Sequence, residues 1–265
     1  MNEIRDLIIG IDIGKEYTQI CYYDRKAEEA RSLSMKVGTS QYEAPGCICY
    51  RTEQNDYCVG LEAQYFSREK GGIMLGNIYD ICQKEESIQV AGKDKEPAEL
   101  LAHFLKGMLK FLGIQDIVKN TKCMCITSPE LDAIQVRNYQ KACGIAGFPA
   151  EKYMLMDYGE SFYYYALGQK RETWNRSVAW YAFDGDKIAF RKLTINAASR
   201  PILVNLEEPV STTLETEDEI RDVEFCRFIT KTLGKELFSS VQITGEGFDQ
   251  QWAQQSVKLL CHQGR

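Results

Sequence analysis

The sequence predicts an α/β protein made of two consecutive units of the same design. Short segments with alternating apolar side chains, typical of strands, are interleaved with longer segments whose apolar residues recur at helical spacing. Three strands followed by alternating helices and strands occur in the first half of the chain, and the same order begins again near residue 178. Each copy opens with two apolar strands joined by a tight turn, which indicates a hairpin.

The first unit, residues 1–170, opens with a predicted meander of three strands. These strands are expected at Leu7–Gly14, Tyr17–Tyr23 and Ser32–Val37. Two further short strands, Cys47–Tyr50 and Tyr57–Gly60, flank a polar turn. A short helix is expected at Leu61–Arg68, and the glycine- and charge-rich residues 71–96 indicate an insertion or loop with short strands.

Helical periodicity is clearest in the remainder of this unit. From Pro97 to Leu112 the apolar residues form one stripe, and proline is accepted in the first turn of a helix. The elements expected next are a strand at Cys123–Thr127, a helix at Asp132–Cys143 that ends at Gly144, a strand at Lys152–Asp157 and a helix at Glu160–Leu167. The aromatic run Phe162–Tyr165 in the last helix either fills a core or forms a patch for a partner.

The second unit, residues 171–265, begins with the strongest hairpin signal in the chain. Strands at Val178–Phe183 and Ile188–Ile195 flank the turn Asp184-Gly185-Asp186. The elements expected next are a strand at Ile202–Leu206, a helix from residue 216 that ends at Gly234, a strand at Val241–Ile243 and a helix at Asp249–Leu260. Acidic residues in the first turn of the helix at 216 suit the helix dipole, and Gly234 suits its end.

The composition is that of a globular protein without a nucleic-acid-binding surface. In 265 residues, 44% are hydrophobic and 26% are charged, so a core can form. The net charge is -6 and no Lys/Arg-rich stripe is available for phosphate contacts, which argues against a nucleic acid partner. The N-terminus lacks the pattern of a signal peptide and no stretch approaches about 18 apolar residues. We therefore expect a cytoplasmic protein with no membrane partner.

Cysteine spacing favours reduced, buried thiols over a zinc site or a catalytic thiol. Cys47 and Cys49, and likewise Cys123 and Cys125, are two residues apart in apolar segments, so each pair lies on one strand face. No C-x-x-C pair occurs among the ten cysteines, and only His103 and His262 could add imidazole ligands. No Ser-His-Asp or Cys-His arrangement has a spacing that supports hydrolase chemistry.

Four segments, in order along the chain, resemble motifs of one protein family. "IGIDIGKEYTQICYYD" resembles the first phosphate motif of chaperone-like ATPases, and "CITSPELDAIQVRNYQKACGIAGF" resembles the strand, proline and helix that follow in them. "GESFYYYALG" resembles their first connecting helix, and "VQITGEGF" resembles their adenosine motif. The chain is therefore similar to the actin, heat-shock chaperone and sugar kinase ATPase superfamily, as one of its uncharacterised bacterial branches.

The resemblance implies two tandem ribonuclease-H-like lobes, each a mixed five-stranded sheet with helices. The first lobe would be residues 1–170 with the first phosphate motif, and the second would be residues 171–265 with the adenosine-type motif. The family's second lobe continues with one more strand and a terminal helix, for which this sequence offers no segment. We expect either a reduced lobe or a truncated chain.

The resemblance also implies that ATP or ADP binds with Mg. Asp12 would hold the Mg ion through a water and take part in catalysis with Glu160, the glutamate of the connecting helix. Hard divalent ions prefer such oxygen ligands, and glycine in the first turn lets backbone N–H groups approach a phosphate. The nucleotide-contacting positions would be Gly14, Lys15, Glu16, Tyr17, Thr18, Asp184, Gly185, Gly245, Glu246 and Gly247.

Two departures from the family pattern bear on activity. Lys15 and Glu16 replace the small hydroxyl residues usual in the first turn, and Glu16 would repel a phosphate unless it points away. In the second unit, alignment of strand ends puts Ala182 where the family has its aspartate, which leaves Asp184 in a structural hairpin turn. If the turn slides by two residues instead, Asp184 or Asp186 would face the phosphates.

The expected function is an actin- or chaperone-like nucleotide switch with weak or no hydrolysis. The alternative is a degenerate pseudo-ATPase that serves as an interaction module or assembly scaffold, with a protein partner or self-assembly. A sugar kinase is the weaker third possibility, because no catalytic base for a second substrate can be named.

Overall fold

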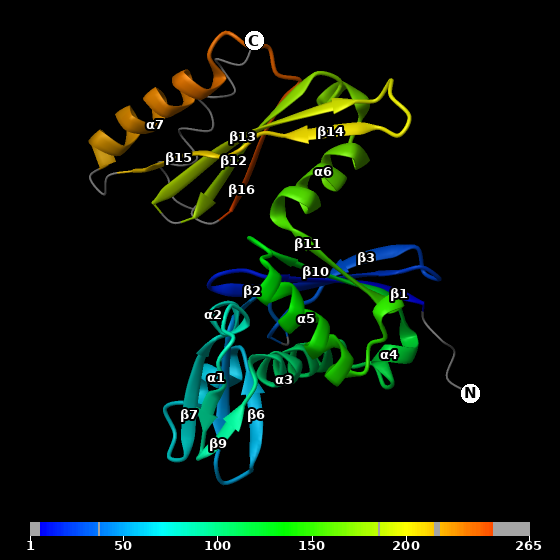
Figure 1. The fold of residues 1–265 in the computed structure, drawn as a ribbon, viewed down its shortest axis with the longest axis vertical. Helices are drawn as coiled ribbons and strands as arrows, with labels where there is room; N and C mark the ends of the chain where they lie inside the picture. The colour runs from blue at the N-terminus through cyan, green and yellow to red at the C-terminus, as the bar shows by residue number, and fades with distance from the viewer. Residues whose placement is uncertain (1–5, 37, 185, 215–217, 246–265) are drawn as a thin grey trace. The chain divides into compact units, whose positions relative to one another are not determined.

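A computed structural model describes residues 6–36, 38–184, 186–214 and 218–245 (Figure 1). It confirms the mixed α/β class, with two mixed sheets, two small antiparallel sheets and helices α1 to α7 in these ranges. The chain divides into two compact units, Met1–Ser161 and Phe162–Arg265, so the division falls within helix α6 (Tyr158–Gly168). Within the same ranges, no helix is long and apolar enough to span a membrane.

The main sheet of the first unit has the strand order β11-β10-β1-β2-β3, with β4 also paired to β2. The strands are β1 (Leu7–Ile13), β2 (Tyr17–Asp24), β3 (Glu29–Ser32), β4 (Glu43–Pro45), β10 (Thr121–Ser128) and β11 (Tyr153–Asp157). The β1-β2 and β2-β3 pairs are antiparallel, whereas β10 is parallel to both β1 and β11. The prediction of a strand at Ser32–Val37 is wrong. The third strand ends at Ser32, because its pairing with β2 stops at the Cys21–Ser32 partners.

Helices α3 (Pro97–Lys110) and α5 (Ala133–Ala146) form the core of this unit with one face of the sheet. They contact each other, and Figure 1 shows both on the same side of the sheet. The α3 prediction is confirmed, with Pro97 in its first turn. The predicted end of α5 at Gly144 is wrong, because the helix continues to Ala146 and Gly147 takes the left-handed conformation at φ 93°.

A smaller sheet with the order β6-β5-β7 adjoins this core. It consists of β5 (Cys47–Arg51), β6 (Asp56–Val59) and β7 (Gly72–Asn77), with α1 (Leu61–Phe66) beside it. The elements that complete the unit are α2 (Ile78–Cys82), the β8-β9 hairpin (Ile88–Val90 and Lys93–Lys95) and α4 (Ile117–Asn120). The expected insertion with short strands therefore contains β7, a helix and a hairpin.

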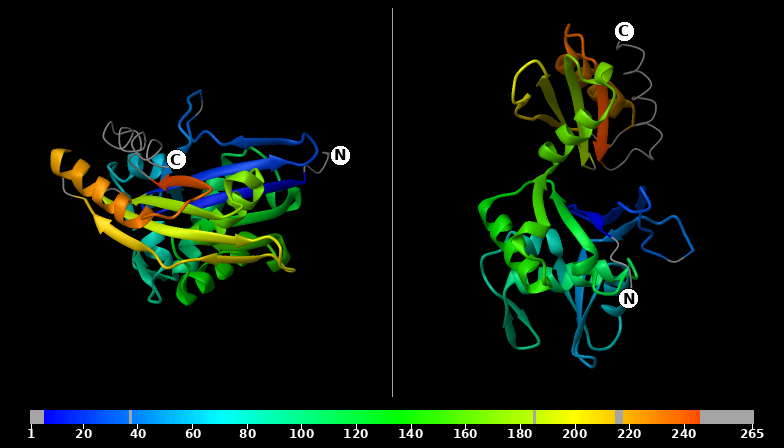
Figure 2. Two further views of the ribbon diagram at one scale, coloured as in Figure 1. Left: turned by 90° about the horizontal axis from the view of Figure 1, so that it is seen from above. Right: turned by 90° about the vertical axis from the view of Figure 1, so that its right-hand side faces the viewer.

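The second unit is built on a sheet with the order β14-β13-β12-β16, with β15 also paired to β13. The strands are β12 (Ser177–Asp184), β13 (Lys187–Asn196), β14 (Leu203–Leu206), β15 (Val210–Thr213) and β16 (Ser240–Gly245). The core side chains of α7 (Asp218–Leu233) pack on β12 and β13, and Figure 2 shows this helix from two further sides. Strand β15 was not predicted, because its four residues are mostly exposed and do not alternate.

The aromatic run of α6 has two environments. Phe162 is 5% exposed and its ring stacks on Trp180, with centroids 4.3 Å apart. Tyr164 and Tyr165 are 50% and 55% exposed. The core alternative therefore holds for Phe162, whereas the two exposed tyrosines lie at the surface.

Candidate functional site

The carboxyl ends of three parallel strands, β1, β10 and β11, meet at one edge of the first sheet. Asp12 is the register partner of Thr127, and Ser128 is the partner of Asp157. Parallel strands bring their last residues to a common edge, which is where open α/β sheets bind ligands. This edge, with Asp12, Thr127 and Tyr158, is the candidate site.

Asp12 is held at this edge by hydrogen bonds from two hydroxyl groups. Its Oδ1 atom accepts a bond of 3.1 Å from Thr127 Oγ1, and the Tyr158 hydroxyl bonds to the same carboxyl group. Burial raises the pKa of Asp12 above its ordinary value, and the bonds from Tyr158 and Thr127 oppose that shift. A bound cation would favour the ionised form of this carboxyl group and so offset the effect of burial.

Gly14 closes the β1-β2 hairpin, and its backbone is committed to that turn. Its N–H donates to the Tyr17 carbonyl oxygen at 2.9 Å. A Cβ atom at Gly14 would lie 2.9 Å from that oxygen and 3.2 Å from the Tyr158 hydroxyl. Both contacts are too close for a side chain, so glycine is required here. The Gly14 N–H, which the sequence offered as a phosphate donor, is used within the turn.

The rest of the turn is held through its carbonyl groups by Asn77, the last residue of β7, and by Gly46, which links β4 to β5. Asn77 Nδ2 donates to the Lys15 carbonyl oxygen, and the Gly46 N–H donates to the Glu16 carbonyl oxygen at 2.7 Å. The side chains of Lys15, Glu16 and Tyr17 are exposed. The turn therefore presents these side chains to solvent while its backbone is fixed.

Thr18 lies on the opposite face of the sheet from Asp12. Thr18 and Ile20 alternate with exposed residues along β2 and point to the face that α3 and α5 cover. Thr18 is 0% exposed, and its Oγ1 atom has no hydrogen-bond partner among the described residues. The structure thus places Thr18 in the core and away from Asp12.

Glu160 occupies the first turn of α6, directly after the candidate edge. Its N–H donates to Asp157 Oδ1 at 2.7 Å, so Asp157 caps the start of this helix. Burial raises the pKa of the Cys125 thiol to about 11, and the nearby Cys123 and Glu160 add to the shift. Glu160 therefore lies close enough to interact with Cys125, on the sheet face that also carries Asp12.

In the second unit, Asp184 and Gly245 lie at the carboxyl edge of their own sheet. Asp184 ends β12 and pairs with Lys187 in the hairpin. Gly245 ends β16 at φ 103°, and a Cβ atom there would lie 1.9 Å from the Phe183 carbonyl oxygen. The close approach of the Phe183 carbonyl group is sufficient to require glycine at this position. The predicted positions Gly185, Glu246 and Gly247, and the predicted helix at 249–260, lie outside the described residues.

Comparison with known proteins gave one family. Residues 29–265 match the model described as the C-terminal part of a family of unknown function, DUF5716. The chain belongs to the DUF5716 family. No curated protein matched it. The DUF5716 match includes Thr127, Tyr158 and Glu160, and it starts after Asp12 and Gly14.

The described part of this DUF5716 chain offers no ready-made cage for a metal ion. No three His, Cys, Asp or Glu side chains are arranged there to hold one. A Mg site made of one carboxylate, waters and phosphate oxygens needs no such cluster. Free thiols occur throughout, and Cys49, Cys58, Cys82 and Cys143 are buried.

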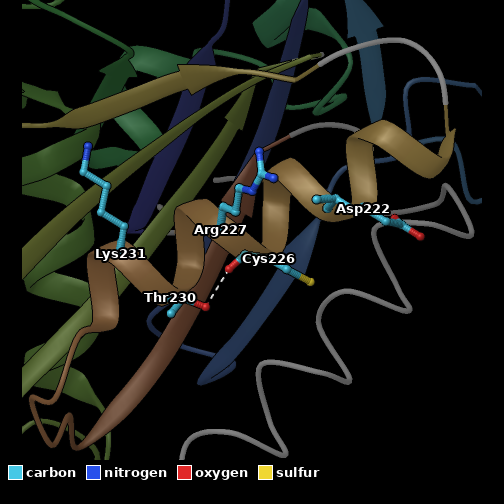
Figure 3. A pocket seen from close by; sticks show the side chains of 6 residues that line it. Asp222, Cys226, Arg227, Thr230 and Lys231 are labelled. Carbon is cyan, nitrogen blue, oxygen red and sulfur yellow. Dashed lines mark hydrogen bonds between the residues drawn. The ribbon is translucent and has the colours of Figure 1, made fainter.

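A separate hollow of about 600 Å³ lies along α7 and contains none of the predicted site residues (Figure 3). Its lining residues are Asp222, Val223, Cys226, Arg227, Thr230 and Lys231, all from that helix. The core side chains of α7 lie elsewhere on the helix, so the hollow is on a face that does not pack on the sheet.

Sequence reasoning missed Thr127, Tyr158 and Asp157 as parts of the candidate site. Thr127 was placed only as the end of a strand, and Tyr158 lay just outside the predicted helix. The polar residues at the ends of two apolar strands were the available signal. The strand register that puts Thr127 beside Asp12 is a property of the folded sheet.

Proposed function

We propose that this DUF5716 chain is a nucleotide-binding protein of the actin-like ATPase superfamily. It binds ATP or ADP with Mg at the carboxyl edge of the first sheet and hydrolyses ATP weakly or not at all. The observation that carries the proposal is the partly buried Asp12 carboxyl group, which accepts a hydrogen bond from Thr127 where three parallel strands end.

The repeated strand order supports a pair of ribonuclease-H-like lobes. In the first unit β1 lies between β2, which is antiparallel to it, and β10, which is parallel to it. In the second unit β12 lies in the same way between the antiparallel β13 and the parallel β16. In each unit the third strand pairs with the second on its outer side. This likeness between the units is expected of a duplicated lobe.

The chemistry of the edge suits a magnesium nucleotide. Mg²⁺ keeps several waters and binds proteins through one or two carboxylates together with substrate phosphates. Asp12 would hold such an ion through its waters, with Thr127 orienting the carboxyl group. Glu160 is the candidate to position an attacking water, on the strength of the family resemblance.

Weak hydrolysis follows from how the first turn is used. The Gly14 N–H donates to Tyr17, so it does not serve the phosphates in this conformation. Lys15 and Glu16 stand where hydroxyl side chains would otherwise contact them. Stabilisation of a phosphoryl-transfer transition state depends on such preorganised donors.

The second candidate function is a pseudo-ATPase that acts as an interaction module or scaffold. The same committed N–H group and the inward-facing Thr18 favour it. In that case the protein would bind a protein partner through its surface, and the candidate site at Asp12 would no longer bind a nucleotide.

Calorimetry with Mg-ATP and Mg-ADP separates the two. Wild type should bind with micromolar affinity, and Asp12→Ala should abolish the heat. Asp80→Ala changes an exposed aspartate in the first turn of α2 and is the matched control, with binding expected to be unchanged. Equal binding by wild type and Asp12→Ala would contradict the proposed site. If no variant binds Mg-ATP or Mg-ADP, the nucleotide-binding function is excluded and the scaffold function is supported.

A further inference from the structure

The Tyr158 side chain reaches from the start of α6 into the candidate site. Its hydroxyl bonds to the Asp12 carboxyl group and lies 3.2 Å from the position of a Cβ atom on Gly14. Tyr158 therefore contacts both the residue expected to hold the metal and the turn expected to hold the phosphates. No motif in the sequence assigned it a role.

Two hydroxyl donors already occupy the Asp12 carboxyl group. Thr127 donates to Oδ1 from the neighbouring strand β10, and that strand is fixed by its parallel pairing with β1. Tyr158 is not in a strand of the sheet, because it follows β11 and begins α6, so its displacement would break no strand pairing. A water-coordinated metal ion at Asp12 would need the space that the phenol hydroxyl takes.

Tyr158 is also tied to the helix that joins the two units. Phe162 follows it by four residues, one helical turn, so the two rings lie on the same side of α6. Phe162 is buried against Trp180 in the core of the second unit, with ring planes 12° apart. A displacement of Tyr158 would thus act on the first turn of a helix anchored in that unit.

We propose that Tyr158 is the gate of the nucleotide site. Its hydroxyl bond to Asp12 closes the site, a magnesium nucleotide must displace it, and the displacement is passed to the first turn of α6. This inference rests on the proposed function and adds its regulation. Tyr158 acts through Asp12 and is a positioning residue, since it takes no part in the chemistry.

The test uses the whole chain with Mn²⁺ as a spectroscopic substitute for Mg²⁺, alone and with ADP. Tyr158→Phe keeps the ring and removes the hydroxyl, and Tyr165→Phe makes the same change at an exposed position of the same helix. Loss of one hydrogen bond to a charged group should tighten Mn-ADP binding roughly tenfold in Tyr158→Phe, with Tyr165→Phe equal to wild type. Asp12→Asn should abolish binding in every background.

A second measurement keeps the test decisive if Tyr158→Phe is poorly folded. Amide hydrogen exchange in the first turn of wild-type α6 should speed up when Mn-ADP is added, because the gate opens. Unchanged exchange with bound Mn-ADP would overturn the proposal.

The outcomes separate the gate from the function it regulates. Equal affinity in wild type and Tyr158→Phe, lost in Asp12→Asn, would overturn the gate and leave the nucleotide site standing. Binding seen only in Tyr158→Phe would support both. No binding by any folded variant would refute the nucleotide site, and the gate with it.

Discussion

Replacement of Thr18 by valine should stabilise the protein. Thr18 is 0% exposed, its hydroxyl has no partner among the described residues, and its neighbours in the core are apolar side chains. Valine keeps the branched shape and exchanges the hydroxyl for a methyl group. The substitution removes a polar group that the core does not satisfy.

The size of the gain follows from the cost of burying an unpaired hydroxyl. An unsatisfied buried donor or acceptor costs roughly 1–3 kcal/mol, so Thr18→Val should raise the free energy of unfolding by about 1 kcal/mol. For a chain of this size, that change corresponds to a rise in Tm of about 2–4 °C. Because Thr18 faces away from Asp12, the affinity for Mg-ADP should not change.

Urea denaturation and calorimetry of three variants test this prediction. Thr18→Ser keeps the hydroxyl and loses the methyl group, which should cost about 1 kcal/mol. Thr127→Val makes the valine change at the hydroxyl that donates to Asp12, and it should destabilise the protein. A loss of stability in Thr18→Val would mean that the hydroxyl has a partner, and a several-fold loss of Mg-ADP affinity would place Thr18 at the ligand.

Two further predictions concern a close contact and an ion pair. Gly10→Ala should lower the free energy of unfolding by about 1 kcal/mol, because its Cβ atom would lie 2.8 Å from Cys21 Sγ. Urea denaturation should show that adding Cys21→Ala to Gly10→Ala restores the free energy of unfolding. If it does not, the loss comes from the backbone at Gly10 and not from the contact with Cys21. The hydrogen bond from Arg51 is the main cause that lowers the pKa of Asp56 below 3.8. The pair therefore stabilises the fold at pH values above 3.8. This stabilisation is lost as the pH falls through the pKa of Asp56 in the folded protein. Arg51→Gln should therefore lower Tm at pH 7 and have little effect near pH 2, whereas an equal loss at both pH values would exclude this linkage.

The elements that the sequence predicts well are those whose own side chains carry the signal. The stripe of α3 and the hairpin at Asp184 each contain their periodicity or turn residues, and both are present as expected. Strands β3 and β15 are short and largely exposed, so neither alternation nor apolar content marks them. Their hydrogen bonds come from neighbouring strands, which the local sequence does not reveal.

The candidate site likewise contains residues that the sequence indicates and residues that only the folded sheet brings together. Asp12 and Gly14 stand out in the sequence, because an acid and a glycine interrupt an apolar hairpin. Thr127 and Tyr158 are more than a hundred residues away and join them only through parallel strand pairing. Lys15 and Glu16 were expected beside the ligand, and the structure adds that their carbonyl groups accept hydrogen bonds from Asn77 and Gly46.

The sequence by itself determined that residues 7–24 form a hairpin with Asp12 and Gly14 beside its turn, and it put both Asp12 and Thr18 at the ligand. The strand register of the folded sheet separates these two residues onto opposite faces. Side chains alternate along a strand, and Asp12 pairs with Gln19, the residue next to Thr18. The tertiary structure decided which face is dry. Helices α3 and α5 cover the side of Thr18, which buries its hydroxyl, and on the other side Thr127 and Tyr158 donate hydrogen bonds to Asp12. Burial depends on what packs against a face, and strand alternation carries no information about that.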